Sequence, residues 1–414
     1  MNEYQKFTLD QVSVNIYSGG TPTTTNPDFW NGNFPWLSSG ETRNRYITKT
    51  EKSITEQGIK NSSTRLAKKN DIIIASAGQG FTRGQTSFSN IDTYVNQSLI
   101  VIRANEEIAN PKYLFFNLSN RYEELRKLSD AHSSRGSLTT KLLKGLEICL
   151  PNLQTQNKIA EILTSLDDKI ELNNRMNQTL GNIAQAIFKQ WFVDFRFPGF
   201  DGELVDGLPK GWSMGKVGEI VEVTDFVANG SFASLKENVN LLEQNDLSVF
   251  ALYVRTTDNN NNFNGNLKYV DKSSYEFLKK STLYGNEVII SNVGDVGTVF
   301  RPPVWLQKPM TLGSNAIMIK ENILCNYLYE FFSSYQGQYL LSGIVSGSAQ
   351  PKFNKTSFRN LEILVPNEQI IVEFNNFYNR ILDKIINNRS EIETLTELRN
   401  SLLPKLMSGK INVN

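Results

Sequence analysis

The sequence is poor in the residues that most often build metal sites and disulfide frameworks. It has 414 residues but only one histidine, His132, and two cysteines, Cys149 and Cys325. Two cysteines cannot form a disulfide framework or a four-ligand zinc cage, and one histidine excludes a His-rich metal site. We therefore expect no metal site in this chain. Cys149 lies in a short apolar segment, where we expect it to be a small core residue.

Long apolar runs and a strong charge of either sign are also missing. No segment approaches the roughly 18 apolar residues that a membrane-spanning helix needs. Residues 1–6 lack the apolar core of a signal peptide, so we expect a cytoplasmic protein. The 43 Lys and Arg residues nearly balance the 42 Asp and Glu residues. This balance excludes a protein held on nucleic acid by bulk positive charge, but it allows local basic patches.

The motifs of common enzymes are incomplete. Gly78–Gly84 follows an apolar segment and resembles a phosphate-binding loop, but it lacks the Gly-Lys-Ser/Thr ending that places a lysine on the phosphates. His132 lies in a polar stretch with no nucleophile pattern around it. We therefore expect a chain that is not an enzyme. The alternative is a fused nuclease or methyltransferase, which an activity assay on the isolated chain would reveal.

What the sequence does contain is an internal repeat. Leu146–Asn152 reads LEICLPN and Leu361–Asn367 reads LEILVPN, which gives an offset of 215 residues (361 − 146). The match continues without a gap through about 40 further positions. Residues 7–12 match residues 212–217 less closely, at an offset of 205 (212 − 7). The chain is therefore expected to consist of two copies of one unit.

Each copy begins with a mixed, β-rich region and ends with a long helix, so we predict an α+β fold. Residues 71–78 and 287–294 are apolar runs that end in turns, as in buried strands. Residues 96–103 and 313–320 form a second matching pair of strands. A helix is expected after each of these, from Pro111 to about Leu128 and from Cys325 to about Leu341.

The long helices carry a sustained heptad pattern with spacings of four and three residues, which is typical of a coiled-coil seam. Asn173 and Asn388 occupy matching seam positions, where buried amides can fix the register. We predict that the two helices pair within the chain and run antiparallel; the alternative is that each packs only on its own globular region. The predicted helix–helix core consists of Ile159, Leu163, Leu166, Ile170, Asn173, Leu180, Ile187, Tyr378, Ile381, Ile385, Asn388, Leu395 and Leu402.

Basic residues gather in the polar loops of both β-rich regions. Arginine can make bidentate contacts with guanine, and lysine near serine and threonine suits phosphate groups. Among these residues we favour Arg43, Arg83 and Arg255 as base contacts. The candidate DNA-binding residues are Arg43, Arg45, Lys68, Lys69, Arg83, Arg135, Arg255, Lys352 and Lys355.

The repeat, together with three local motifs, resembles the specificity (S) subunit of type I restriction–modification systems over nearly the whole chain. Ser18–Trp36 resembles the start of a target-recognition domain in that family, and Gly347–Lys355 resembles its end. The heptad helices with the entry Leu-Pro-Asn-x-Gln at residues 150–154 resemble the family's spacer regions. The first copy departs at Ser133–Thr140, which lacks the Gln-Pro pair, and the second departs at Asn229–Phe232, which lacks Gly-Thr-Pro.

This resemblance implies a two-part DNA reader with an internal pseudo-two-fold repeat. It implies target-recognition domains at 1–150 and 212–365, spacer helices at 151–195 and 366–414, and a linker at 196–211. The expected partners are double-stranded DNA, two methyltransferase (M) subunits and restriction (R) subunits. No cofactor is expected in this chain, whereas S-adenosylmethionine is expected in the M subunits, which would methylate adenine for defence against foreign DNA. The alternative is a coiled-coil scaffold that binds only other proteins.

Overall fold

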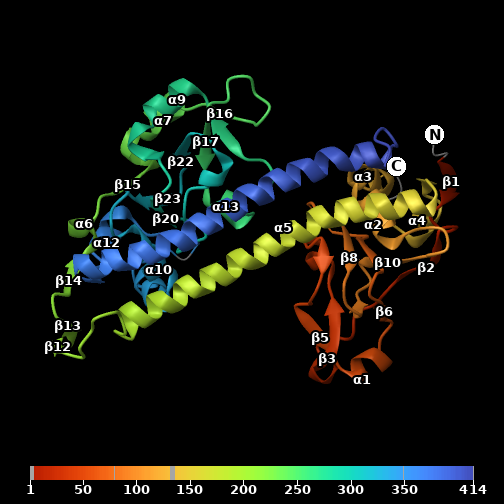
Figure 1. The fold of residues 1–414 in the computed structure, drawn as a ribbon, viewed down its shortest axis with the longest axis horizontal. Helices are drawn as coiled ribbons and strands as arrows, with labels where there is room; N and C mark the ends of the chain where they lie inside the picture. Colours follow the sequence, from red (N-terminus) through yellow and green to blue (C-terminus); the bar gives the residue numbers. More distant parts are fainter. Residues whose placement is uncertain (1–3, 79, 131–135, 348, 414) are drawn as a thin grey trace. The chain divides into compact units, whose positions relative to one another are not determined.

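The computed structural model describes residues 4–78, 80–130, 136–347 and 349–413 (Figure 1). The chain forms two compact units. Unit 1 comprises Met1–Ile170 together with Thr394–Asn414, and unit 2 comprises Glu171–Glu393. Within the described ranges, no helix is both long and apolar enough to cross a membrane.

Unit 1 begins with a β-rich region. Its elements are β1 (Gln5–Thr8), β2 (Ser13–Ser18), η1 (Pro27–Phe29), β3 (Trp30–Leu37), η2 (Ser39–Arg43), β4 (Tyr46–Ile47), β5 (Lys52–Ile54), α1 (Glu56–Lys60), β6 (Arg65–Ala67), β7 (Ile72–Ala75), β8 (Thr86–Ser89), β9 (Thr93–Val95), β10 (Leu99–Ala104), α2 (Pro111–Ser119), α3 (Tyr122–Asp130), α4 (Thr140–Lys144) and β11 (Glu147–Leu150). One sheet has the strand order β2-β10-β7-β8-β4, and a second has the order β5-β3-β9-β6. β1 and β11 form a separate antiparallel pair.

Unit 2 contains the second β-rich region. Its elements are β12 (Leu204–Val205), β13 (Leu208–Pro209), β14 (Ser213–Lys216), α6 (Val217–Ile220), β15 (Val223–Asp225), η4 (Phe226–Asn229), α7 (Phe232–Asn238), β16 (Leu241–Leu242), β17 (Ala251–Val254), α8 (Thr256–Asn260), β18 (Lys268–Val270), α9 (Lys272–Phe277), η5 (Lys279–Ser281), β19 (Thr282–Leu283), β20 (Val288–Ser291), β21 (Val299–Phe300), η6 (Val304–Leu306), β22 (Met310–Leu312), β23 (Ala316–Ile319), α10 (Cys325–Ser333), α11 (Tyr335–Gly343), α12 (Lys355–Arg359) and β24 (Glu362–Val365). The two main sheets have the orders β15-β23-β20-β21 and β16-β18-β17-β22-β19, and β14 pairs with β24.

The two β-rich regions share a common strand topology, to which unit 1 adds β4 and unit 2 adds β16. The order β2-β10-β7-β8 in unit 1 corresponds to β15-β23-β20-β21 in unit 2. In the second sheet of each unit one pair is parallel, β3 with β9 and β17 with β22, and its neighbours are antiparallel. The predicted α+β fold, with two β-rich regions and two long helices, is thereby confirmed.

The start of the repeat differs by three residues from the sequence comparison. The backbone N–H of Leu9 donates to the carbonyl of Leu146 over 2.8 Å, and Val217 makes the same bond to Leu361 over 2.9 Å. Leu146 and Leu361 are partners at the offset of 215, so Leu9 corresponds to Val217, an offset of 208 (217 − 9) rather than 205. Both side chains are completely buried. Their shared burial therefore identifies the equivalent positions, which the weak local match did not.

The expectation for Cys149 was wrong. Side chains in β11 alternate between the two faces of the strand, as the pleat requires. Ile148 and Leu150 point inward and are 0% and 2% exposed, whereas Cys149 is on the exposed face. The apolar composition of this short strand therefore does not indicate burial at every position.

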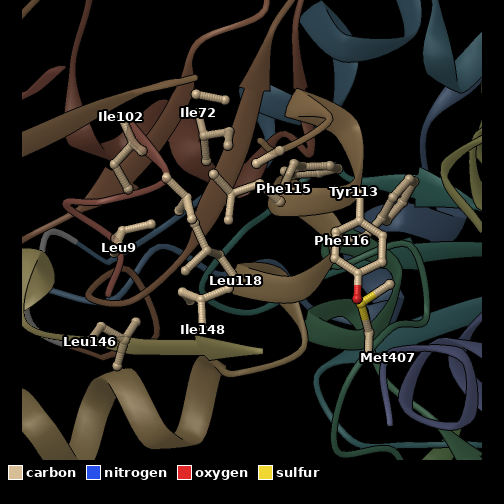
Figure 2. Close-up of a cluster of buried hydrophobic side chains, with 14 of the residues drawn as sticks. Leu9, Ile72, Ile102, Tyr113, Phe115, Phe116, Leu118, Leu146, Ile148 and Met407 are labelled. Atoms are coloured by element: carbon tan, nitrogen blue, oxygen red, sulfur yellow. The ribbon is translucent and has the colours of Figure 1, made fainter. Parts of the chain in front are cut away.

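The core of unit 1 lies on both faces of its five-stranded sheet. Ile72 and Ile102 face α2, where Phe115 and Phe116 cover them, and Ile148 of β11 joins the same cluster (Figure 2). The alternate residues of the same strands pack in a second cluster that includes residues of β3 and β9. Burial on both faces explains why the strand sequence is a continuous apolar run rather than an alternating one.

Each single helix expected after the second strand pair is broken into two. In unit 1, α2 and α3 replace the helix expected from Pro111 to Leu128, and in unit 2, α10 and α11 replace the one from Cys325 to Leu341. In unit 2 the break has a clear cause, because the side chain of Ser334 accepts a hydrogen bond from the N–H of Gly337 and starts a new helix. A Cβ at Gly337 would lie 2.1 Å from the carbonyl oxygen of Phe331. Only glycine therefore permits this close turn.

Two long helices, α5 (Leu153–Phe188) and α13 (Glu368–Met407), pass through both units (Figure 1). The repeated Pro-Asn motif marks their starts, because the side chain of Asn152 accepts from the N–H of Thr155 and that of Asn367 accepts from the N–H of Ile370. These are N-cap bonds, which satisfy backbone donors that have no partner inside the helix. A turn of π-helix, η3 (Lys189–Val193), follows α5 directly.

Within unit 2 the long helices run antiparallel. Asn173 donates to Glu391 and Asn388 donates to Asn177, each over 2.8 Å, while the ring of Trp191 lies 5.9 Å from that of Phe374. The partner number falls as the number along α5 rises, which defines the direction. Asn173 and Asn388 are each 1% exposed.

The other predicted seam residues are also sheltered from solvent. Ile159, Leu163, Tyr378 and Ile381 are buried. The remaining predicted seam residues are half-buried; they are Leu166, Ile170, Leu180, Ile187, Ile385, Leu395 and Leu402.

Candidate nucleic-acid interface

A short helix follows the parallel strand in each β-rich region. It is η2 after β3 and α8 after β17. The backbone N–H of Ser38 donates to Glu41 over 2.9 Å, and that of Arg255 donates to Asp258 over 3.2 Å, three residues on in both cases. The carboxylates satisfy backbone donors at the helix start, as in a capping box. The two short helices therefore have the same capping interaction and follow equivalent strands.

The turn after β7 in unit 1 and the turn after β20 in unit 2 each lie against this short helix. In unit 1 the hydroxyl of Thr42 donates to Gln85 over 3.3 Å, and in unit 2 the amide of Asn260 donates to Asp295 over 2.7 Å. Gly78 and Gly294 in these turns have φ values of +130° and +81°, which glycine adopts without a Cβ penalty. α8 and the turn after β20, whose residues Asn260 and Asp295 are 35 positions apart in the sequence, thus meet.

A third segment completes the same edge of each unit. The N–H of Leu138 donates to the carbonyl of Ser76 over 2.9 Å, and the N–H of Phe353 donates to that of Asn292 over 3.0 Å. We define the reading edge of unit 1 as residues 38–43, 76–78, 80–85 and 136–139. The reading edge of unit 2 is residues 255–260, 291–298, 346–347 and 349–353.

Four of the predicted DNA-binding residues are exposed. The side chain of Arg43 is 64% exposed and pairs with Glu51 at the surface. Lys352 is exposed on the reading edge of unit 2, where its backbone bridges to Val293 and Ser346. Lys68 and Lys69 are exposed in the turn after β6. Surface pairing of Arg43 costs little to break, so all four cations are accessible to phosphate groups.

Three other predicted residues hold carboxylates inside their own unit. Arg83 is 8% exposed and pairs with Asp130 over 2.5 Å. Arg255 pairs with Asp258 over 2.5 Å. Lys355 pairs with the largely buried Asp225 over 3.0 Å.

These pairs give Arg83, Arg255 and Lys355 a structural role in shaping the reading edges. Gly136 has a φ of +56°, which favours glycine, and a Cβ there would lie 1.6 Å from the guanidinium of Arg83, so a larger residue would displace that guanidinium. Contact between these three cations and DNA stays a prediction.

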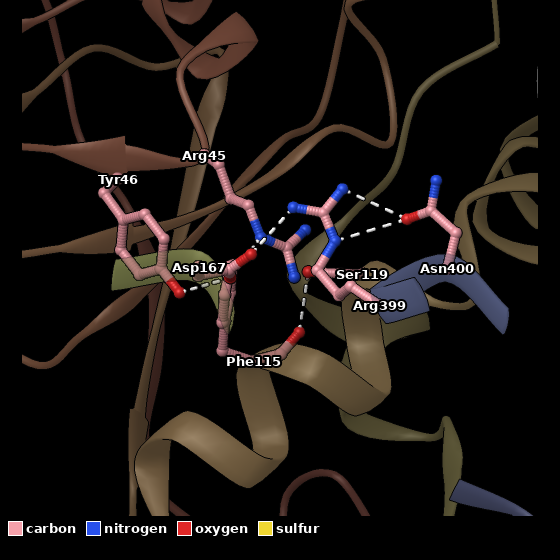
Figure 3. A network of polar contacts seen from close by, with 7 residues as sticks. All are labelled: Arg45, Tyr46, Phe115, Ser119, Asp167, Arg399 and Asn400. Atoms are coloured by element: carbon pink, nitrogen blue, oxygen red, sulfur yellow. Dashed lines mark hydrogen bonds and ion pairs between the residues drawn. The ribbon is translucent and has the colours of Figure 1, made fainter. Parts of the chain in front are cut away.

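Arg45 lies away from the surface loops, beneath the long helices of unit 1. Its guanidinium stacks 4.8 Å from the ring centre of Phe115 and donates to Asp167 on α5 over 2.7 Å. Asp167 also accepts from Arg399 on α13 over 2.7 Å and from the hydroxyl of Tyr46 over 2.5 Å (Figure 3). One carboxylate therefore joins the β-rich region of unit 1 to both long helices.

The charge on Asp167 is secured by its neighbours. Burial raises the pKa of this carboxyl, but Arg45, Arg399 and the hydroxyl of Tyr46 outweigh burial and hold the pKa below its ordinary value. Sequence reasoning missed Asp167, which is separated from Arg45 by 122 residues. Arg399 lies four residues after Leu395 and three before Leu402, which is a position of the heptad seam. An arginine there is a signal that a buried acidic partner is needed.

Two predicted features remain to be placed. Arg135 and His132 lie outside the described residues. Among the residues that the structure does describe, no group of three or more His, Cys, Asp or Glu side chains could hold a metal ion. The reading edges thus present amides, hydroxyls and scattered cations, which can bind polar and anionic groups.

Comparisons with known proteins agree with this architecture. A family model described as the type I restriction modification DNA specificity domain matches residues 1–182 and 209–400. The chain is 27% identical over 419 residues to the specificity subunit of the type I restriction enzyme MjaIX of Methanocaldococcus jannaschii, covering 96% of this chain and 91% of that one. It is 26% identical to the HindI specificity subunit of Haemophilus influenzae, covering 99% of this chain and 100% of that one.

A solved structure shows the same fold. The crystal structure of the S subunit of a type I restriction–modification system from M. genitalium matches with a TM-score of 0.56 and 15% identity, over 98% of this chain and 96% of that one. The sequence resemblance, the repeated topology and the family model therefore agree. The chain belongs to the family of specificity subunits of type I restriction–modification systems.

Proposed function

We propose that this protein is the DNA-reading subunit of a type I restriction–modification complex and that each β-rich region reads one half of a two-part target. The observation that carries this proposal is the repeated reading edge. The same three segments meet in both units, and each edge presents different side chains, such as Arg43 in unit 1 and Lys352 in unit 2. Equivalent edges with different side chains suit the reading of two different half-sites.

The division of labour along the chain follows from this proposal. Residues 1–150 and 212–365 are the target-recognition domains, residues 151–195 and 366–414 are the spacer helices, and residues 196–211 are the linker. The spacer helices dock two M subunits, and R subunits join the resulting complex. S-adenosylmethionine is bound by the M subunits, which carry the adenine methyltransferase activity, while this chain contributes binding alone.

The test is methylation by the reconstituted complex. The chain is co-expressed with its M subunit, and methylated adenines are mapped by sequencing genomic DNA. The expected result is one motif with two specified halves and an unspecified gap, and no methylation with either subunit alone. Because phosphate contacts release counterions, the complex should also bind this DNA with an affinity that falls as salt rises.

Two outcomes would contradict the proposal. Methylation by the chain without an M subunit would make it an enzyme. A complex that forms with the M subunit but binds no DNA at low salt would favour a scaffold that binds only proteins.

A further inference from the structure

Both units place an arginine on an aromatic ring beneath the long helices, and the comparison between them exposes an incomplete site. Phe115 and Tyr329 are each the fifth residue of the equivalent helices α2 and α10. The guanidinium of Arg45 stacks 4.8 Å from the ring centre of Phe115, and that of Arg301 stacks 4.6 Å from the ring centre of Tyr329. The two arginines therefore stack on corresponding aromatic residues, although Arg45 precedes β4 and Arg301 follows β21.

The charged groups beside the arginine in unit 1 are missing in unit 2. At the offset of 215 residues, Asp167 corresponds to Leu382 (382 − 167) and Arg399 corresponds to Ala184 (399 − 184). Unit 1 thus fills this place with a carboxylate and a second guanidinium, whereas unit 2 has two apolar side chains there. Neither apolar side chain can accept a hydrogen bond from Arg301.

A cavity occupies the place of the missing groups. It has a volume of about 220 Å³, and its walls include Arg301, Leu382 and Ala184. Nη2 of Arg301 donates to Asn326 over 2.8 Å. Its Nε and Nη1 are buried and have no hydrogen-bond partner within the described part of the chain. A buried guanidinium without acceptors is costly, so this cavity calls for an acceptor.

A buried acidic side chain forms part of the same wall. Glu330 is 3% exposed; one carboxyl oxygen accepts from the hydroxyl of Tyr378 over 2.7 Å, and the other has no partner within the described residues. Burial raises the pKa of Glu330, while Tyr378 and Arg301 act in the opposite direction. A raised pKa favours the neutral carboxylic acid, which can donate a hydrogen bond into the cavity.

The remaining walls combine positive charge with aromatic surface. Arg389 stacks 5.4 Å from the ring centre of Trp305, and both side chains line the cavity. Two guanidiniums beside one carboxyl give the cavity a net positive charge. The rings of Tyr329 and Trp305 add flat apolar surface for the body of a ligand.

We propose that this cavity of unit 2 binds a small organic carboxylate, with the carboxylate group on Arg301 where Asp167 stands in unit 1 and the apolar part against the aromatic rings. The volume sets the size of the ligand. At roughly 30 Å³ per water molecule, the cavity holds about seven waters or a ligand of about seven to ten non-hydrogen atoms. A nucleotide is too large, whereas benzoate fits.

The experiment measures binding to the full chain, purified with its M subunit. Benzoate is titrated at constant ionic strength, with chloride and phosphate as comparison anions, and the thermal midpoint is followed. A ligand that binds only the folded state should raise the midpoint steadily with the logarithm of its concentration, by roughly 3–5 °C at ten times its Kd. Isothermal titration calorimetry then gives the stoichiometry, which should be one benzoate per chain.

Two variants and a control locate the site. Arg301→Gln should weaken benzoate binding at least tenfold, because it removes the charge that the carboxylate needs. Leu382→Asp should supply the carboxylate from the chain itself, so it should raise the midpoint without ligand and abolish the response to benzoate. Lys384→Gln is the control. Lys384 is an exposed residue of α13 that does not line the cavity, so this change should leave binding unchanged.

The outcomes are decisive in both directions. Saturable benzoate binding that is lost in Leu382→Asp supports the proposal even if Arg301→Gln fails to fold. Equal shifts from chloride, phosphate and benzoate, an unchanged response in Leu382→Asp, or no response up to 20 mM benzoate, a concentration at which even millimolar affinities are visible, would overturn it.

Discussion

At the scale of single residues, arginine performs two different tasks in this molecule. Arg43 is exposed at the end of a short helix, whereas Arg45, two residues later, is half-buried against Phe115 and Asp167. A guanidinium can do either, because it is always charged and also stacks well on aromatic rings. The difference is set by the surroundings of each side chain and not by its own identity.

The network around Asp167 predicts a strong effect of one substitution. Asp167→Asn should lower the free energy of unfolding by about 3 kcal/mol, because it leaves Arg45 and Arg399 without their buried counter-charge. This is the low end of the usual range, since both guanidiniums are partly exposed and can be hydrated. Urea unfolding measures the loss, and Asp168→Asn at an exposed position is the matched control.

The effect of pH on the same network has a definite sign. The folded-state pKa of Asp167 is lower than the ordinary 3.8, so its stabilising contribution is fully present above that value. The contribution is lost as the pH falls through the lower folded-state pKa. The difference between wild type and Asp167→Asn should therefore be constant from about pH 5 to pH 8 and shrink below about pH 4. A difference that instead grows on acidification would contradict this account.

Measurements of both DNA binding and stability should distinguish Arg43 from the other two favoured arginines, Arg83 and Arg255. Arg43→Ala should weaken DNA binding by about 1–3 kcal/mol if it reads a base, with no loss of stability. Arg83→Ala and Arg255→Ala should also lower the thermal midpoint, because each removes an internal ion pair. Lys384→Ala is the control on an exposed helix face. Wild-type affinity and site preference in all three variants would show that other residues read the DNA.

At the scale of secondary-structure elements, the repeated Pro-Asn motif starts each long helix. Asn152→Ala and Asn367→Ala should each lower the free energy of unfolding by about 1 kcal/mol, the usual value of an N-cap side chain. Denaturant unfolding of the two variants checks the value. Asn376→Ala, at an exposed position inside α13, should have a much smaller effect, and equal losses at all three positions would rule out a specific capping role.

The sequence predicts the secondary-structure elements better than it predicts the contacts between residues that are far apart in the chain. The ungapped offset of 215 residues and the heptads indicate the two regions and the long helices, because both signals extend over tens of residues. The break at Ser334 depends on a local cap and on the close approach of Gly337 to Phe331, which no periodic pattern records. Arg45 and Asp167 meet across 122 positions, so no local pattern predicts that this cation points inward.

At the scale of the whole molecule, the two units share a strand topology but differ in the polar groups that they bury. Unit 1 buries a charged network where unit 2 has Arg301 beside a cavity, although the strands around them are ordered alike. Strand order is fixed by backbone pairing and by apolar side chains, which both units retain. The polar side chains between the strands and the long helices have diverged, and the loops of the reading edges have diverged with them.

The strand pair at the base of each β-rich region has a consequence for how such chains can change. Thr8 lies opposite Glu147 in the pair β1–β11, and Lys216 lies opposite Glu362 in the pair β14–β24. The first and last strands of each region are therefore paired, so the region begins and ends at adjoining points. We call such a region, between its paired end strands, a cassette. A cassette can be exchanged without rethreading the rest of the chain, so we expect its binding specificity to be transferable as one segment.

A chimera in which residues 9–146 also replace residues 217–361 should thus fold and should direct methylation to a target that carries the first half-site sequence twice. Sequencing of methylated adenines in cells that express the chimera with the M subunit would read out both halves. A retained second half-site would show that specificity resides outside residues 217–361, in the part of the chain that the chimera leaves unchanged.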